Sequence, residues 1–130
     1  MEDLLKQVDI LVVTVALTNE TKHLLDRSAF AHIKKNCILI NTARGSIIDT
    51  AALLEALDSG SVSAVALDVT DPEPLPPNHP LFSDEKYRGR VLIVPHIGSA
   101  TVDARTAMAR LSIAHVDQGL QGQSLSYAAQ

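Results

Sequence analysis

Short apolar runs alternate with amphipathic stretches along most of this chain. Four of the runs are rich in β-branched residues and nearly continuous, which is typical of strands buried on both faces of a parallel sheet. They span residues 8–17, 38–42, 63–69 and 91–94. Around them, apolar positions at helical spacing predict helices over residues 2–7, 26–35, 50–58 and 101–118. The alternation predicts an α/β fold, a Rossmann-type half-domain of four parallel strands with helices.

Individual residues mark where some of these elements begin and end. Asp49 is a suitable N-cap for the helix over 50–58, and Gly60 is expected to close that helix. Gly119 is expected to end the last helix. Residues 70–89 are rich in proline and polar side chains, which predicts a long, stiffened loop of the kind that tends to be functional.

The expected helices do not cover the sheet evenly. Right-handed crossovers place the helices of the first three connections on one face. Only the first and last helices remain for the opposite face of four strands that are apolar on both sides. The pattern therefore predicts a half-bare parallel sheet, against which another half-domain would pack.

Composition and charge narrow the classes of function. The chain has 130 residues, one domain's worth, and 46% hydrophobic with 20% charged residues is ordinary for a globular protein. Lys+Arg total 11 against 15 Asp+Glu, and the positive charges are scattered, so no nucleic-acid partner is expected. No apolar run approaches the ~20 residues of a membrane span, so no membrane partner is expected either. The first residues lack the pattern of a secretion signal, and the cytoplasm is the expected compartment.

The cysteine and the histidines limit the possible chemistry further. A single cysteine, Cys37, excludes an internal disulfide framework and any multi-cysteine metal site, and it is expected to be a small buried hydrophobic residue. The histidines form neither an H-E-x-x-H string nor a pair at i, i+4, so no metal is predicted. The sequence also contains no G-x-S-x-G string, which argues against a serine hydrolase.

Polar side chains follow three of the predicted strands at their carboxyl ends. Arg44 follows the second strand, Asp68 and Glu73 follow the third, and His96 follows the fourth. In an open parallel sheet, ligands bind in the crevice beyond these ends, and neighbouring strands lie about 4.8 Å apart. Each residue alone also fits a structural role, as a surface cation, a turn cap, a solvated loop acid or a hydrogen-bonded histidine. Their joint placement favours one shared cleft.

Such a set of side chains supports proton transfer beside an anionic substrate. Histidine titrates near neutral pH and can donate a proton, and a neighbouring carboxylate favours its charged form and fixes its ring. An arginine pairs with a substrate carboxylate through its planar fork and polarises a carbonyl group. The set contains no electron source, so the reduction of a keto acid here needs a hydride from a cofactor.

Three strings, ILINTARGS, ALDVTDPEPLPPNHPLF and VLIVPHIGSAT, resemble the D-isomer-specific 2-hydroxyacid dehydrogenases in their order and spacing. The resemblance runs from about Leu4 to Gly122 and is closest to the glyoxylate/hydroxypyruvate reductase branch of the family. It implies that Arg44 grips the carboxylate and carbonyl of the substrate. It also implies that His96 is the acid/base that protonates the new hydroxyl group, and that Glu73 is the acid that pairs with it.

The resemblance further implies a cofactor, NADP or NAD, with the choice left open. Asp68 would contact the nicotinamide carboxamide, and Thr42 and Gly98 fall where the backbone of the family meets the cofactor. Ala16 falls where a proline or serine usually borders the adenosine side. The implied substrate is a small 2-keto acid such as glyoxylate or hydroxypyruvate, and the full-length protein is expected to be a homodimer.

The phosphate-cradling G-x-G-x-x-G string of the family is absent from this sequence. The chain is therefore expected to be a fragment, inactive by itself. Residues 1–119 would be the C-terminal part of the NAD(P)-binding domain, including the returning helix over 101–118, and residues 120–130 a tail at the start of the substrate domain. Two other hypotheses remain: a non-catalytic, nucleotide-responsive module of the corepressor type, and a truncated product without activity that associates through its bare sheet.

Overall fold

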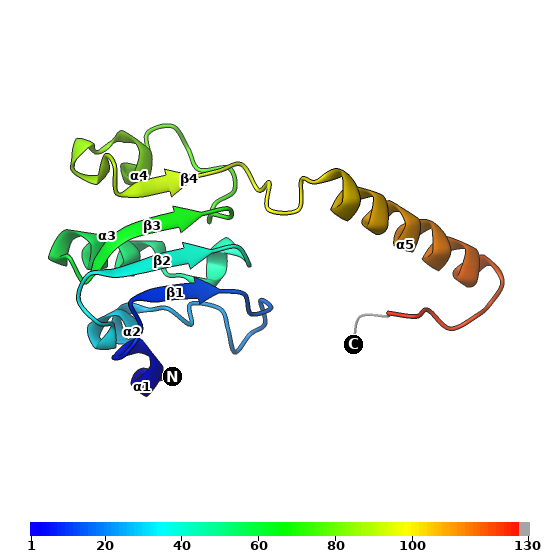
Figure 1. Cartoon of the computed structure of the whole chain (residues 1–130), viewed down its shortest axis with the longest axis horizontal. Coiled ribbons are helices and arrows are strands. Elements are labelled where there is room, and N and C mark those ends of the chain that lie inside the picture. Colours follow the sequence, from blue (N-terminus) through cyan, green and yellow to red (C-terminus); the bar gives the residue numbers. More distant parts are fainter. Residues whose placement is uncertain (128–130) are drawn as a thin grey trace. The chain divides into compact units, whose positions relative to one another are not determined.

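Four strands form a single parallel sheet. The structure is a computed structural model that describes residues 1–127. The strands lie side by side in chain order (Figure 1): β1 (Ile10–Val13), β2 (Cys37–Asn41), β3 (Val62–Leu67) and β4 (Val91–Ile93). Each neighbouring pair is parallel, so the predicted α/β fold is confirmed.

Helices precede, connect and follow these strands. They are α1 (Glu2–Leu5), α2 (Arg27–His32), α3 (Thr50–Ser59), α4 (Pro80–Ser83) and α5 (Val102–Leu120), with the short 3₁₀ helices η1 (Gly45–Ile47) and η2 (Glu85–Tyr87). The chain forms two compact units, one from Met1 to His96 and one from Ile97 onward. The sheet and its predicted strand-end residues through His96 belong to the first unit.

The ends of α3 are those that the sequence predicts. The side chain of Asp49 accepts hydrogen bonds from the backbone N–H groups of Ala51 and Ala52, at 2.9 and 3.3 Å, and so caps the first turn. Gly60 closes the helix in the left-handed conformation, with φ 75°.

The strand register separates two faces of the sheet. On one face the side chains form two rows across the strands: Leu11, Leu39, Val65 and Val91, then Val13, Asn41, Leu67 and Ile93. In Figure 1, α2 and α3 lie behind the strands. Leu39 and Val65 of this face belong to the same hydrophobic core as residues of these helices. Leu53 and Leu57 of α3 are at most 2% exposed and belong to the same hydrophobic core. The core of the first unit therefore lies between the sheet and these helices.

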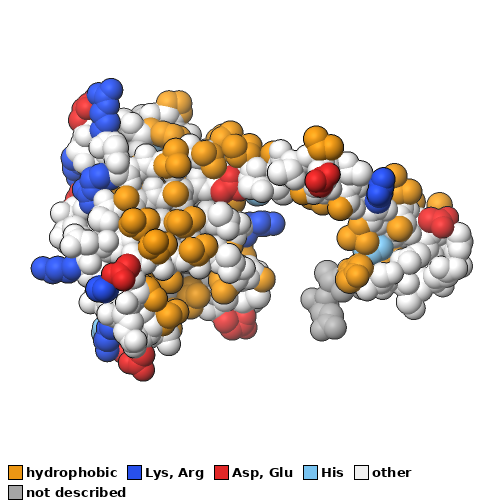
Figure 2. Space-filling model, in the orientation of Figure 1, with side chains coloured by type: hydrophobic (Ala, Val, Ile, Leu, Met, Phe, Trp, Pro, Cys, Tyr) orange, Lys and Arg blue, Asp and Glu red, His pale blue; other side chains and the backbone are white. Residues whose placement is uncertain are grey.

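The opposite face of the sheet exposes apolar side chains, as Figure 2 shows. Ile10, Val12 and Leu92 are each more than half exposed, at 55%, 51% and 60%. In the first unit the sheet is thus half-bare, as the crossover argument predicts. The expectation that the first helix covers this face is wrong, because α1 packs against α2 and buries Leu5 in the core.

The first strand is shorter than its apolar run. β1 covers Ile10–Val13 rather than residues 8–17, because its partner β2 ends at Asn41 and pairs with β1 only as far as Val13. The prediction of strands buried on both faces is also wrong. Alternate residues of β1 are exposed, and so are Ile38 of β2 and Leu92 of β4.

Two helices end at positions that differ from the prediction. α2 ends at His32 because Ile33 already has an extended backbone, with φ −69° and ψ 139°. α5 continues through Gly119 to Leu120, and it is Gly122 that adopts the left-handed backbone, with φ 68°. Among the apolar residues of this helix, Met108 and Leu111 are 51% and 42% exposed.

The proline-rich segment over residues 70–89 contains two short helices that its composition does not predict. His79 caps the start of α4, and its Nδ1 accepts a hydrogen bond from the Leu81 N–H at 3.3 Å. Asp84 begins η2 by accepting from the Lys86 N–H at 3.1 Å. Helices of three or four residues are too short to produce a periodic hydrophobic pattern.

Candidate active site

His96 and Glu73 form a close polar pair at the carboxyl edge of the sheet. Nδ1 of His96 lies 2.7 Å from Oε1 of Glu73, and both side chains are close to half exposed. Glu73 lies in the turn that follows β3, and His96 lies just after β4. Because β3 and β4 are neighbouring parallel strands, their carboxyl ends bring the two residues together.

The surroundings of Glu73 favour its ionised form. The hydrogen bond from His96 is the main cause that holds the pKa of Glu73 below its usual value. The Thr70 N–H, which donates to Oε2 at 3.3 Å, and the charge of Arg44 lower this pKa further. The carboxylate is thus an ionised acceptor that can hold the imidazole ring in one orientation.

The backbone at His96 is unusual for a residue with a side chain. Its φ is 52°, in the left-handed region, and its N–H donates to the Val94 carbonyl oxygen at 3.0 Å. Backbone conformations of this kind cluster at functional sites, because the surrounding structure must maintain them. The tight turn places the imidazole beside Glu73 immediately after β4 ends.

A pocket of about 390 Å³ lies beside this pair. Asp68, Glu73 and His96 line it, and Phe82 and Ile93 contribute apolar walls. A mostly apolar pocket with a few convergent polar groups is typical of a site for a small ligand. Three of the four predicted strand-end residues therefore share one pocket.

Arg44, the fourth of these residues, does not line that pocket. Its exposed guanidinium donates from Nη1 to the Ala43 carbonyl oxygen at 2.6 Å. Its charge nevertheless lowers the pKa of Glu73, so it lies within electrostatic range of the pair.

The four residues predicted to contact a cofactor have different surroundings. Asp68 directly follows β3 and is 8% exposed. Thr42 directly follows β2, Ala16 lies beyond the end of β1, and both are exposed. These three positions share the carboxyl edge of the sheet, whereas Gly98 belongs to the second unit. Their roles stay predictions.

Contacts between the loop after β2 and the turn after β3 were not predicted. At Gly45, a Cβ atom would lie 2.0 Å from the Thr70 carbonyl oxygen, so no larger residue fits without a shift of the backbone. The hydroxyl group of Ser46 donates a hydrogen bond to the Asp71 carboxylate. In the sequence Gly45 directly follows Arg44, but nothing in the sequence indicates which residues of the other loop it contacts.

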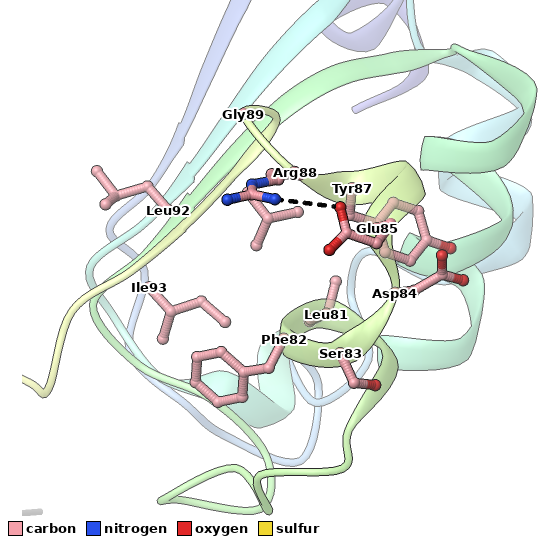
Figure 3. A pocket seen from close by; sticks show the side chains of 11 residues that line it. Leu81, Phe82, Ser83, Asp84, Glu85, Tyr87, Arg88, Gly89, Leu92 and Ile93 are labelled. Carbon is pink, nitrogen blue, oxygen red and sulfur yellow. Dashed lines mark hydrogen bonds and ion pairs between the residues drawn. The ribbon is translucent and has the colours of Figure 1, made fainter.

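A larger hollow, of about 480 Å³, lies between β4 and the segment formed by α4 and η2 (Figure 3). It shares Phe82 and Ile93 with the pocket beside His96. Its charged lining includes Arg88, which pairs with Glu85 at 3.4 Å. Its lining does not include His96, Glu73 or Asp68, so the histidine–glutamate pair lies at the smaller pocket.

None of the helices within residues 1–127 has the length and hydropathy that a membrane crossing requires. Over the same residues, no cluster of three or more histidine, cysteine, aspartate or glutamate side chains could hold a metal ion.

A parallel sheet with polar side chains gathered at its carboxyl edge is the architecture of nucleotide-binding α/β domains. The sequence model of the D-isomer specific 2-hydroxyacid dehydrogenase NAD binding domain matches residues 1–98. The chain belongs to this family, and the resemblance stated from its three strings is confirmed.

Individual relatives agree with this assignment. The chain is 44% identical over 123 residues to glyoxylate reductase from Thermofilum pendens, covering 95% of this chain and 35% of that protein. It is 40% identical over 117 residues to glyoxylate reductase/hydroxypyruvate reductase from Mus musculus, covering 90% and 34%. The chain also matches a crystal structure of a D-isomer specific 2-hydroxyacid dehydrogenase from Xanthobacter autotrophicus Py2 in complex with NADPH and MES. The TM-score is 0.83 and the sequence identity 33%, and the match covers 99% of this chain and 51% of that one. The chain spans about a third of the length of the curated relatives it matches.

Proposed function

We propose that this chain supplies the acid–base and substrate-binding part of an active site that reduces small 2-keto acids to 2-hydroxy acids with NADH or NADPH. The 2.7 Å contact between His96 and Glu73, on a pocket that Asp68 also lines, is the observation that carries the proposal. Relatives named glyoxylate reductase and hydroxypyruvate reductase support glyoxylate and hydroxypyruvate as the substrate class.

The proposed roles follow from which side-chain atoms already form hydrogen bonds within the protein. Reduction adds a hydride to the keto carbon and a proton to the keto oxygen. Nδ1 of His96 is bonded to Glu73, so Nε2 is the ring atom that would deliver this proton. Glu73 remains ionised to lower pH than an ordinary glutamate because its pKa is lowered, and it keeps the ring oriented. Arg44 would pair with the substrate carboxylate through two parallel hydrogen bonds.

The residues present fit the nicotinamide end of the cofactor. Asp68 places a nearly buried carboxyl group in a partly apolar pocket, where it can accept hydrogen bonds from a carboxamide. We propose backbone contacts to the cofactor at Thr42, Ala16 and Gly98. When bound, the cofactor supplies the hydride that the keto carbon receives. We further propose that tight binding needs a G-x-G-x-x-G loop from additional chain, because this sequence carries none.

A chimaeric enzyme tests the proposal directly. In the Thermofilum pendens glyoxylate reductase, the matching segment of 123 residues would be replaced by the corresponding part of this chain. Consumption of NADH or NADPH with glyoxylate and with hydroxypyruvate is the measurement. We expect turnover in the chimaera, and a loss of about 10²–10⁴-fold in kcat for His96→Asn, because a positioned general acid contributes that much. For Arg44→Ala we expect kcat/KM to fall by about 10²-fold or more, since a charged donor to the substrate is removed.

Matched control variants distinguish a loss of these roles from a general loss of folding. His32→Asn changes a histidine at the end of α2, and Arg88→Ala changes an arginine in the other hollow, and both should leave kcat/KM within about 2-fold. A chimaera that is folded but inactive would contradict the proposed reaction. If the same chimaera bound NADPH, the non-catalytic, nucleotide-responsive hypothesis would gain support instead.

The proposal extends to domain organisation, assembly and compartment. We assign residues 1–119 to the NAD(P)-binding domain and 120–130 to the start of a substrate domain; residues 128–130 lie outside the described residues. We propose a homodimer for a protein of the family's full length, on the basis of the resemblance. The cytoplasm is the proposed compartment, because Cys37 is a free, buried thiol and suits reducing conditions.

A further inference from the structure

We propose that Ser46 and Asp71 are positioning residues for the His96–Glu73 pair. The inference rests on the proposed function, because its catalytic meaning depends on that pair acting on a substrate. Ser46 lies two residues after Arg44, and Asp71 lies two residues before Glu73. The hydrogen bond between them therefore joins the loop that carries the arginine to the turn that carries the glutamate.

The two segments are in close contact around this bond. Gly45 packs against the Thr70 backbone so closely that an added Cβ would lie 2.0 Å from the carbonyl oxygen. The Thr50 hydroxyl group donates to the Asp71 carbonyl oxygen at 3.5 Å. A cavity of about 10 Å³ lies between the segments, room for about one water molecule. The turn after β3 is thus held on the loop after β2 by backbone packing and side-chain bonds together.

The same turn holds Glu73. The Thr70 N–H donates to Oε2 of Glu73 at 3.3 Å, and the Thr70 hydroxyl group donates to the Pro72 carbonyl oxygen at 2.9 Å. The other carboxylate oxygen, Oε1, bonds to His96. A connected path of contacts therefore runs from Ser46 through Asp71 and Thr70 to Glu73 and the imidazole. Releasing the Ser46 end should loosen the carboxylate that orients the ring.

The first test measures the pKa of Glu73 in the full 130-residue chain. The NMR signal of the Glu73 side-chain carboxyl carbon is recorded as a function of pH. His96→Ala sets the scale, because it removes the main cause that lowers this pKa. We expect Ser46→Ala to raise the Glu73 pKa by at least half of the rise seen in His96→Ala. Ser63→Ala is the matched control: its hydroxyl group donates to the Asn36 carbonyl oxygen at 2.9 Å, near the amino end of β3, and its loss should leave the pKa unchanged.

A second variant keeps the test valid if Ser46→Ala does not fold. Asp71 is exposed, so Asp71→Ala, which removes the acceptor of the Ser46 hydrogen bond, should be tolerated. Removal of a negative charge near Glu73 would by itself lower the Glu73 pKa, whereas release of the turn would raise it. A rise in Asp71→Ala therefore supports the positioning role, and a fall or no change contradicts it.

The second measurement is kcat in the chimaeric reductase. We expect Ser46→Ala to lower kcat by about 10-fold to 10²-fold, the effect of a displacement of order 1 Å in the supporting structure. If Ser46→Ala lowers only the unfolding temperature, and leaves the Glu73 pKa and kcat as Ser63→Ala does, the bond is merely structural and the inference is wrong. An inactive parent chimaera would count against the proposed function, while the NMR titration would still decide whether Ser46 positions Glu73.

Discussion

Replacing Gly45 with alanine tests how closely the loop after β2 must approach the turn after β3. The added Cβ atom would lie 2.0 Å from the Thr70 carbonyl oxygen, 2.1 Å from the Thr70 carbonyl carbon and 2.6 Å from the Asp71 backbone nitrogen. Non-bonded heavy atoms pack at roughly 3.5 Å, so the two segments must separate by about 1.5 Å. All three neighbours are backbone atoms, and no side-chain rotation can relieve the overlap.

The expected loss of stability combines two effects. Overpacking of this kind costs about 1–3 kcal/mol, and the adjacent cavity of about 10 Å³ is too small to accept a methyl group. A shift of 1.5 Å would also break the hydrogen bond between Ser46 and Asp71, worth about 1 kcal/mol. We therefore expect Gly45→Ala to lower the free energy of unfolding by about 2–4 kcal/mol. For a unit of this size, that corresponds to a fall in Tm of roughly 10–25 °C.

Urea unfolding and thermal unfolding of the 130-residue chain, followed by circular dichroism, measure this loss. Gly60 provides the matched control, because its φ is 75° and nothing lies within 4 Å of a Cβ placed there. Gly60→Ala should cost about 1 kcal/mol from the left-handed backbone alone, and Gly60→Asn less, since asparagine tolerates that conformation. If Gly45→Ala proved no more costly than Gly60→Ala, the close approach of the two segments would not be a determinant of stability.

Three further predictions concern single side chains of the first unit. Asp49→Ala should remove the cap of α3 and lower the free energy of unfolding by about 1 kcal/mol, measured by urea unfolding, while Asp49→Asn should retain most of it. Cys37 is fully buried, and burial raises the pKa of its thiol, so a thiol reagent should react slowly with the native chain and rapidly in urea. Because the folded-state pKa of Glu73 is lowered, its stabilising contribution is present above the ordinary pKa of a glutamate and is lost as the pH falls through the lowered value. Glu73→Gln should therefore reduce the difference in unfolding free energy between pH 7 and pH 3, by less than about 1 kcal/mol because the pair is half exposed to solvent.

The features predictable from sequence were those that depend on neighbouring residues or on strand order. Asp49 and Gly60 could be assigned as caps because each acts on backbone groups within a few residues of itself. His96 and Glu73 could be placed at one edge because parallel strands bring their carboxyl ends together, whatever the detailed register. The left-handed backbone at His96 has no comparable signal, because it depends on the turn after β4.

Contacts between separate loops were outside the reach of such reasoning. Ser46 and Asp71 are 25 positions apart, and neither lies in a periodic pattern. The position of Arg44 outside the pocket lining also depends on side-chain conformation, which spacing along the chain does not determine. Sequence therefore predicts which strand ends meet, whereas the contacts that align the side chains on them require coordinates.

The bare face of the sheet shows most clearly where pattern and structure differ. The strands are apolar on both sides, and burial on both faces is the physical meaning of that pattern. The helices of the first unit cover one face only, and Ile10, Val12 and Leu92 remain more than half exposed on the other. The error in predicting the burial of β1 therefore has a cause outside the strand itself. The apolar pattern predicts burial of a face that the described helices of this unit leave exposed. The pattern therefore indicates a sheet suited to be covered on both faces, although the helices of this unit cover only one.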